Sequence, residues 1–207
     1  MFMPLDLAAA ARHLSRSDPV MRKIVKTVGA CELRPGRRGD HFTTLARAIV
    51  GQQLSTKAAE TIWNRVLALR PNGRSLRPED VLTLSAAELR GAGLSNAKVL
   101  YVKDLATRIS DGEIKLSRLT RLGDDQIVAS LTSVKGIGRW TVEMFLIFRL
   151  GRPDVWPIGD LGIRNAVGRA YGLEPTNENL LTVSEPWRPW RSVASWYLWR
   201  TLDAAPV

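Results

Sequence analysis

The sequence predicts an all-α protein. Helix-capping residues recur along the chain, and apolar residues repeat at spacings of three and four between them. No stretch shows the sustained period-two alternation that a half-buried strand requires. With 207 residues, 45% of them hydrophobic, the chain can build one sizeable core or two small lobes around a cleft.

The first predicted helices are defined by their ends. Asp18 and Pro19 form an N-cap followed by proline at the first helical position, and Gly29 ends this helix. Asp40 opens the next helix, and a further helix follows over Thr56 to Leu69. Apolar residues recur at helical spacing in both: Phe42, Leu45, Ile49 and Val50, then Ala59, Ile62, Val66 and Leu69.

Two capping patterns organise the middle of the chain. Ser85 and Glu88 have the spacing of a capping box. Ser95 or Asn96 can cap a longer helix that stops at Asp111. Its apolar positions are Val99, Val102, Leu105 and Ile109.

A glycine-containing turn joins two further helices. The arms are Asp125–Leu131 and Arg139–Leu150, and the turn contains Lys135-Gly-Ile-Gly138. Glycines let the backbone turn tightly and approach a ligand, and the amides at the start of the second arm suit a phosphate. Two more helices are predicted, Asp160–Tyr171 and Trp190–Leu202.

Charge and cysteine content limit the classes of function. Lys and Arg exceed Asp and Glu by 30 to 20, a net charge of +10, which favours a polyanionic partner. A basic soluble protein that binds nothing in particular would have the same net charge. The prediction that this chain binds nucleic acid therefore depends on the glycine-containing hairpin. Cys31 is the single cysteine, which excludes an intrachain disulfide and a four-cysteine zinc or iron–sulfur site. Without a signal peptide or a membrane-length apolar stretch, we expect a cytoplasmic protein, nucleoid-associated if bacterial.

The hairpin, the bend after it and the acid Asp160 resemble the helix-hairpin-helix DNA glycosylase superfamily. Within it, the chain is most similar to the 3-methyladenine DNA glycosylase II type, which removes alkylated bases. The similarity covers most of the chain. It includes His41-Phe42 with Ala48–Ser55, the turn Gly93–Lys98, and Trp156–Arg164.

The resemblance implies an architecture. Two helical lobes would face each other across a DNA-binding cleft. One lobe would contain residues 1–42 and 150–207, and the other residues 43–149 with the helix-hairpin-helix motif at 124–150. The extra N-terminal α+β domain of longer bacterial relatives is not expected. We expect a monomer that binds double-stranded DNA containing alkylated bases and no membrane.

The resemblance also implies a reaction. A monofunctional glycosylase would excise bases of the 3-methyladenine and 7-methylguanine type by hydrolysing the N-glycosidic bond, the first step of base excision repair. Asp160 would stabilise the oxocarbenium-like sugar or activate the attacking water, and the sequence leaves both roles open. Asp160 can instead, or also, cap the following helix. Trp140 stands where strand-cutting relatives have the lysine that forms a Schiff base, and an indole cannot do so.

Tryptophans are candidates for the base pocket. An electron-rich aromatic face attracts a cationic alkylated base, and the resemblance points to Trp140, with Trp156 as a second candidate. Among the other tryptophans, three are interpreted as packing residues and two stay undecided: Trp63, Trp190 and Trp199, and then Trp187 and Trp196.

The loop between the two helices that follow Asp40 resembles the family's DNA wedge. Gln53 aligns with the position that fills the gap left by the extruded base, which is leucine in some members. Gln53 could hydrogen-bond to the orphaned base, or Leu54 could supply an apolar wedge. An ordinary solvated loop is the alternative.

Other DNA contacts and a cation site follow from the hairpin. The predicted phosphate contacts are Lys135, Gly136, Gly138, Arg139 and Lys98. No cofactor is required. Relatives often hold a structural monovalent cation, which maps onto the backbone oxygens of Thr132, Val134 and Ile137.

The sequence leaves two rival functions open. A non-enzymatic helix-hairpin-helix protein that only binds DNA would need the basic surface and the glycines, but not Asp160. A glycosylase for another lesion class is the second rival, and the missing strand-cutting lysine and cluster cysteines disfavour it.

Overall fold

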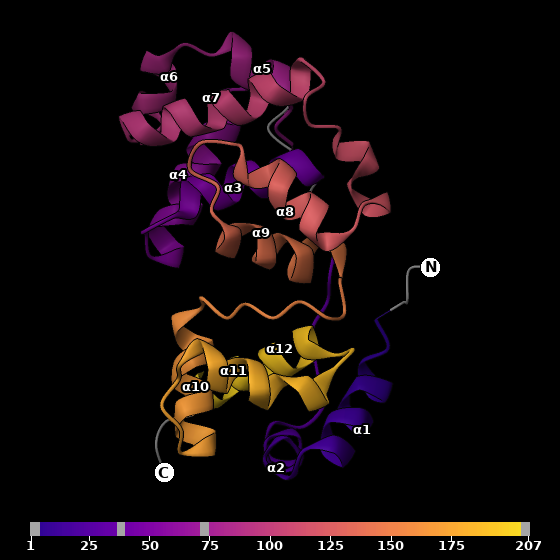
Figure 1. Ribbon diagram of the computed structural model, residues 1–207. Helices are drawn as coiled ribbons and strands as arrows, with labels where there is room; N and C mark the ends of the chain where they lie inside the picture. Colours follow the sequence, from indigo (N-terminus) through magenta and orange to yellow (C-terminus); the bar gives the residue numbers. More distant parts are fainter. Residues whose placement is uncertain (1–4, 37–39, 71–74, 204–207) are drawn as a thin grey trace. The chain divides into compact units, whose positions relative to one another are not determined.

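The computed structural model describes residues 5–36, 40–70 and 75–203 (Figure 1). All regular elements in these three stretches are helical, and no strand occurs there. The all-α prediction is therefore confirmed. In the same stretches, no helix is long and apolar enough to cross a membrane.

The chain divides into two compact units. The terminal unit contains Met1–Gly36 and Leu146–Val207, and the central unit contains Arg37–Phe145. These boundaries fall before the predicted ones at residues 42 and 149. The first differs because helix α3 (His41–Gly51) begins directly after its cap Asp40, so its first residues belong to the central unit.

The central unit is built around α3 and α7. Its other helices are α4 (Thr56–Ala68), α5 (Pro78–Thr83), α6 (Ala86–Gly91), α7 (Asn96–Ser110), the 3₁₀ helix η1 (Leu116–Arg121), α8 (Asp124–Thr132) and α9 (Arg139–Phe145). Asp40, Ser85 and Ser95 accept backbone amides at the starts of α3, α6 and α7, as their spacing predicts. Leu45 of α3 and Leu105 of α7 are completely buried in the core.

The terminal unit combines the two ends of the chain. Its elements are α1 (Leu7–Ser17), α2 (Pro19–Val28), the π-helical segment η2 (Leu146–Leu150), α10 (Leu161–Tyr171), α11 (Asn177–Ser184), the 3₁₀ turn η3 (Glu185–Trp187) and α12 (Arg191–Asp203). The core includes Leu14, Met21, Ile163 and Tyr197, all with no exposed surface. The second arm of the hairpin reaches Leu150 as predicted, but its last five residues widen into π-helical turns.

Short helices α5 and α11 were not predicted. They have six and eight residues, and each buries only one or two side chains, such as Val81 in α5 and Leu180 in α11. So few buried positions give no periodic signal, because a helical repeat needs several turns to show. Packing against longer helices stabilises them instead, as α5 against α7.

Asp18 joins three parts of the terminal unit. Its Oδ1 accepts the amides of Val20 and Met21 at the start of α2. Its Oδ2 accepts the hydroxyl of Tyr171 at 2.6 Å and the Nε1–H of Trp187 at 2.8 Å. The predicted cap is thus a buried carboxylate that accepts four hydrogen bonds. Burial of Tyr171, together with its hydrogen bond to Asp18, raises the pKa of the Tyr171 hydroxyl.

We expect Asp18→Ala to destabilise the protein strongly. The change removes a helix cap and leaves two buried donors unsatisfied, which together cost about 3 to 5 kcal/mol of unfolding free energy. Asp6→Ala is the matched control, because Asp6 caps α1 through one amide only. Denaturant unfolding of both variants checks this, and equal losses would contradict the role of Asp18.

Candidate active site and DNA-binding surface

The turn between α8 and α9 presents backbone amides that lack partners. The amide of Lys135 donates to the carboxylate of Asp104 in α7 at 2.9 Å. The amides of Gly136, Gly138 and Arg139 donate to no acceptor among the described residues. Amides at a helix start attract anions, because they point at the ligand and the helix dipole favours negative charge. The turn therefore has the geometry to hold a phosphate.

The two glycines of the turn serve different purposes. Gly136 has φ +81°, and a Cβ there would lie 2.1 Å from the ring of Tyr101 in α7. A Cβ at Gly138 would meet no atom within 4 Å. Gly136 is therefore required by the fold, whereas Gly138 leaves the outer surface open to a ligand.

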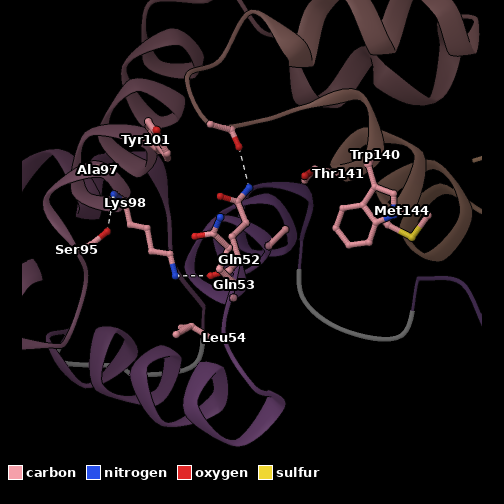
Figure 2. A pocket seen from close by; sticks show the side chains of 13 residues that line it. Gln52, Gln53, Leu54, Ser95, Ala97, Lys98, Tyr101, Trp140, Thr141 and Met144 are labelled. Atoms are coloured by element: carbon pink, nitrogen blue, oxygen red, sulfur yellow. Dashed lines mark hydrogen bonds between the residues drawn. The ribbon is translucent and has the colours of Figure 1, made fainter. Parts of the chain in front are cut away.

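A hollow of about 760 Å³ lies beside this turn within the central unit (Figure 2). Its walls come from the α3–α4 loop, from α7 and from α9. Predicted site residues gather around it: Gln53, Leu54, Lys98, Gly136 and Trp140. The structure thus brings wedge, hairpin and aromatic candidates of the central unit to one place.

The loop between α3 and α4 contains two glutamines in different environments: the side chain of Gln52 is hydrogen-bonded, and that of Gln53 is exposed. Gln52 donates from Nε2 to the carbonyl of Gly136 at 2.7 Å (Figure 2). Gln53 is exposed, and its side chain makes no hydrogen bond within the described residues. Its φ of +57° lies in the left-handed region, which costs a residue with a side chain about 1–2 kcal/mol. Leu54 is 38% exposed on the same hollow.

The charged candidates differ in their surroundings. Lys135 and Arg139 are exposed, and the guanidinium of Arg139 lies 3.6 Å from a carboxylate oxygen of Glu143. Lys98 is partly buried, and its Nζ donates to the carbonyls of Val50 and Gln52. Burial lowers the pKa of Lys98. Two of the three ammonium protons are donated to these carbonyls, so the structure favours a role in holding the loop over the predicted phosphate contact, which stays a prediction.

Trp140 and Trp156 lie in contrasting environments. Trp140 is 49% exposed and lines the hollow together with Met144 (Figure 2). Trp156 is 8% exposed, and its ring meets Trp187 edge to face at 5.2 Å. A ring buried to this degree has little surface left for stacking a base. The structure favours a packing role for Trp156 and leaves Trp140 as the pocket candidate.

Asp160 stands at the start of α10 in the terminal unit. Its Oδ1 accepts the amide of Ile163 at 2.8 Å, so it caps the helix as one of the two interpretations expects. The same oxygen accepts the Nε1–H of Trp199 in α12 at 3.0 Å. Asp160 is half-buried. The carboxylate is therefore oriented by two donors and retains contact with solvent.

Trp199 is itself fixed from two sides. Its ring stacks on Phe148 with centroids 5.7 Å apart. Gly162 leaves room for the bond to Asp160, because a Cβ there would lie 3.0 Å from Asp160 Oδ1 and 3.3 Å from Trp199 Cδ1. Phe148, Trp199 and Gly162 thus form the support of the carboxylate.

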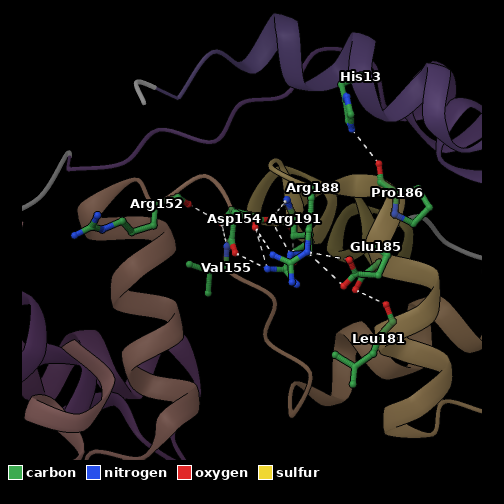
Figure 3. A network of polar contacts seen from close by, with 12 residues as sticks. His13, Arg152, Asp154, Val155, Leu181, Glu185, Pro186, Arg188 and Arg191 are labelled. Atoms are coloured by element: carbon green, nitrogen blue, oxygen red, sulfur yellow. Dashed lines mark hydrogen bonds and ion pairs between the residues drawn. The ribbon is translucent and has the colours of Figure 1, made fainter. Parts of the chain in front are cut away.

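The segment that leads to Asp160 is fastened to the start of α12 (Figure 3). Asp154 binds Arg191 through two oxygens at 2.7 and 2.9 Å, and Arg188 at 3.0 Å. Ser192 donates to the carbonyl of Arg152 at 2.6 Å and accepts the amide of Val155 at 2.9 Å. Bidentate ion pairs of this kind are geometrically specific. They anchor the chain shortly before Asp160, and the cap of α10 anchors it after.

Comparison with known proteins identifies the family. Residues 46–192 match the model of the HhH-GPD superfamily of base excision DNA repair proteins. The chain belongs to this superfamily. Over 97% of its length it is 39% identical to DNA-3-methyladenine glycosylase 1 of Schizosaccharomyces pombe, of which it covers 90%.

Solved structures of relatives agree with this assignment. The superfamily fold of the chain matches the S. pombe 3-methyladenine DNA glycosylase in complex with abasic DNA, with a TM-score of 0.83 and 38% identity. The match covers 95% of this chain and 98% of that protein. A DNA-3-methyladenine glycosidase from Bacillus halodurans gives a TM-score of 0.85 at 32% identity, covering 93% and 88%.

Trp199, which the sequence predicts to be a packing residue, does pack, since its ring stacks on Phe148, and it also donates a hydrogen bond to Asp160 that the sequence does not indicate. It lies 39 residues from the carboxylate that it contacts. No local pattern marks such a pair, because the tertiary fold alone brings α12 to the start of α10. Trp187 proves to be fully buried, and Trp196 is 7% exposed.

We expect Trp199→Phe to slow base excision without weakening DNA binding. The ring stays, but the donor that orients Asp160 is lost, and losing an orienting partner lowers activity about 10-fold or more. Single-turnover rates and DNA titrations measure the two effects separately. Trp196→Phe is the control in the same helix, since the indole N–H of Trp196 makes no bond within the described residues. Equal loss in both variants would refute the orienting role.

Proposed function

We propose that the chain is a monofunctional DNA glycosylase that removes alkylated bases from duplex DNA by hydrolysis of the N-glycosidic bond. The observation that carries this proposal is the oriented carboxylate of Asp160 at a helix start, in a chain whose hairpin has Trp140 where a Schiff-base lysine would stand. Relatives named DNA-3-methyladenine glycosylase support the substrate class.

Asp160 acts on the sugar. As the base departs, the deoxyribose develops oxocarbenium-like positive charge, which a fixed carboxylate stabilises. The same group can hold or deprotonate the attacking water. Because Asp160 is oriented before substrate binds, little reorganisation is needed during the reaction.

Trp140 acts on the base. A cationic alkylated base is attracted to the exposed indole face by stacking and cation–π contact. Such a base already carries positive charge, so it leaves without strong acid catalysis. An indole forms no imine, and hydrolysis by water therefore leaves the DNA strand uncut.

The hairpin and the α3–α4 loop hold the DNA. Free amides at Gly136, Gly138 and Arg139 bind phosphate and position the duplex without reading its sequence. Gln53 fills the gap left by the extruded base, with Leu54 beside it. Gln53 is preferred because its exposed amide has no internal partner.

The hairpin also fits a structural monovalent cation. Backbone oxygens of Thr132 and Ile137 accept no hydrogen bond within the described residues, and that of Val134 accepts one, from Ile137. Carbonyl oxygens of this kind suit hard cations. These three oxygens would hold the ion, which would supply positive charge for a phosphate. The described residues contain no cluster of three or more His, Cys, Asp or Glu side chains suited to another metal.

The test is incubation of the purified protein with alkylated duplex DNA. We expect release of methylated purines, abasic sites that break only after alkali, and no adduct trapped by borohydride. Breaks before alkali would contradict the monofunctional mechanism. Tight binding without any base release would favour the non-enzymatic alternative, and release of oxidised bases alone would change the lesion class.

A further inference from the structure

We propose that Lys98 is a positioning residue for the gap-filling loop, defined as Gly51–Ser55. This inference rests on the proposed function and extends it to a residue that does not touch DNA. The ammonium group would hold the loop in the conformation that enters the duplex. Base extrusion would therefore depend on Lys98, whereas phosphate binding would not.

The contacts of Lys98 are directed at the loop backbone. Its Nζ lies 2.8 Å from the carbonyl oxygen of Gln52 (Figure 2) and 2.8 Å from that of Val50. Both carbonyls belong to the C-terminal end of α3 and the loop that follows. The loop's own backbone bonds near this point are long, at 3.4 Å from Gln52 to Ile49 and 3.3 Å from Leu54 to Gly51. Lys98 therefore supplies the shorter bonds that fix this segment.

The end of α3 needs an external cation. The last carbonyls of a helix lack partners within it, and its C-terminal dipole favours positive charge. The last turn of α3 contains no basic residue. Lys98 reaches it from α7. No carboxylate pairs with Lys98 within the described residues, so the two carbonyls are the compensation for its partial desolvation.

Two hydrogen bonds, here called the clamp, hold Gln52, the residue directly before the proposed gap-filling residue Gln53. Gln52 is held through its carbonyl by Lys98 and through its side chain by the carbonyl of Gly136. Gln53 follows in a left-handed conformation that is unfavourable for glutamine. Such conformations persist where neighbouring contacts determine them. Releasing one side of the clamp should let Gln53 relax away from the gap.

The same helix face also holds the hairpin. Tyr101 packs against Gly136, and Asp104 accepts the amide of Lys135. With Lys98, these residues recur every three positions along α7, so they share one face. One rigid helix thus sets the distance between the gap-filling loop and the phosphate-binding amides.

The experiment compares Lys98→Met with Lys103→Met. Lys103 is the matched control, because it also lies on α7 and donates to a carbonyl, that of Leu84, at 2.7 Å. Two duplexes are used, with 7-methylguanine opposite cytosine or opposite an abasic analogue. The second lacks a pairing partner for the lesion and needs less help in extrusion. Fluorescence of 2-aminopurine beside the lesion reports unstacking directly.

We expect Lys98→Met to slow single-turnover excision from the paired duplex about 10- to 100-fold, as misplaced site groups commonly do. The loss of excision rate in Lys98→Met should be smaller on the unpaired duplex. On the paired duplex, the 2-aminopurine fluorescence of this variant should fall together with its rate. DNA affinity should change by less than about 3-fold with the same salt dependence, since no phosphate contact is lost. Lys98→Arg should restore part of the rate, because guanidinium can donate to both carbonyls. Lys103→Met should behave like the wild type.

Several outcomes would overturn the proposal. Equal losses in the two Met variants, or equal losses on the two duplexes, would indicate a general effect on folding. A weaker salt dependence of binding would indicate a phosphate contact. If Lys98→Met does not fold, Lys98→Gln, which keeps a polar donor, is measured in the same way. A wild type that releases no methylated base would refute the proposed function, whereas the 2-aminopurine signal would still test Lys98.

Discussion

Replacing Asp160 by Asn should reduce base release by at least about 100-fold, the usual effect of removing a group that stabilises transition-state charge. The amide has the shape of the carboxylate, and its oxygen still accepts from Ile163 and Trp199. What it lacks is the negative charge that steadies the sugar. Single-turnover release of methylated bases measures the loss.

The unfolding free energy of two variants distinguishes the catalytic role of Asp160 from its role as a helix cap. Asparagine caps helices about as well as aspartate, so Asp160→Asn should leave the unfolding free energy nearly unchanged. Asp160→Ala should lose about 1 kcal/mol more, because α10 then lacks its cap. If Asp160→Asn excises bases at the wild-type rate with unchanged DNA binding, the catalytic assignment is wrong and Asp160 is only a cap.

Gly136→Ala should damage the hairpin severely, whereas Gly138→Ala should leave it folded. At Gly136 the new methyl group would overlap the ring of Tyr101 and require a positive φ, which together cost about 2 to 5 kcal/mol. At Gly138 the methyl group meets no protein atom. It would stand between the free amides and a phosphate, so DNA affinity should fall about 10-fold with little loss of stability.

A second variant checks the cause at Gly136. Combining Gly136→Ala with Tyr101→Ala removes the overlap but not the backbone strain, so we expect partial recovery of stability. Thermal unfolding and DNA titration of the three variants measure both effects. Full stability of Gly136→Ala alone would show that the turn adapts. Unchanged DNA affinity in Gly138→Ala would place the phosphate elsewhere.

The sequence by itself determined the features that depend on neighbouring residues. Caps at Asp18, Asp40 and Ser95 set helix starts, since a side chain and the amides that it accepts lie within three residues. The Gly-x-Gly turn and the acid at the start of α10 are equally local. Trp140 in place of lysine is a matter of residue chemistry alone. The short helices escaped prediction because packing rather than periodicity stabilises them.

Only the tertiary structure decided which side chains support the candidate site. Lys98 holds a loop 46 residues away, and Trp199 orients a carboxylate 39 residues away. The ring of Tyr101 leaves no room for a side chain at position 136, and the ring of Trp187 packs against that of Trp156. Such pairs form when packed helices bring distant positions together, and a lysine or tryptophan has the same local pattern in any of these roles. The physical reason is that chemistry and caps are properties of short segments, whereas orientation and burial are properties of the packed core.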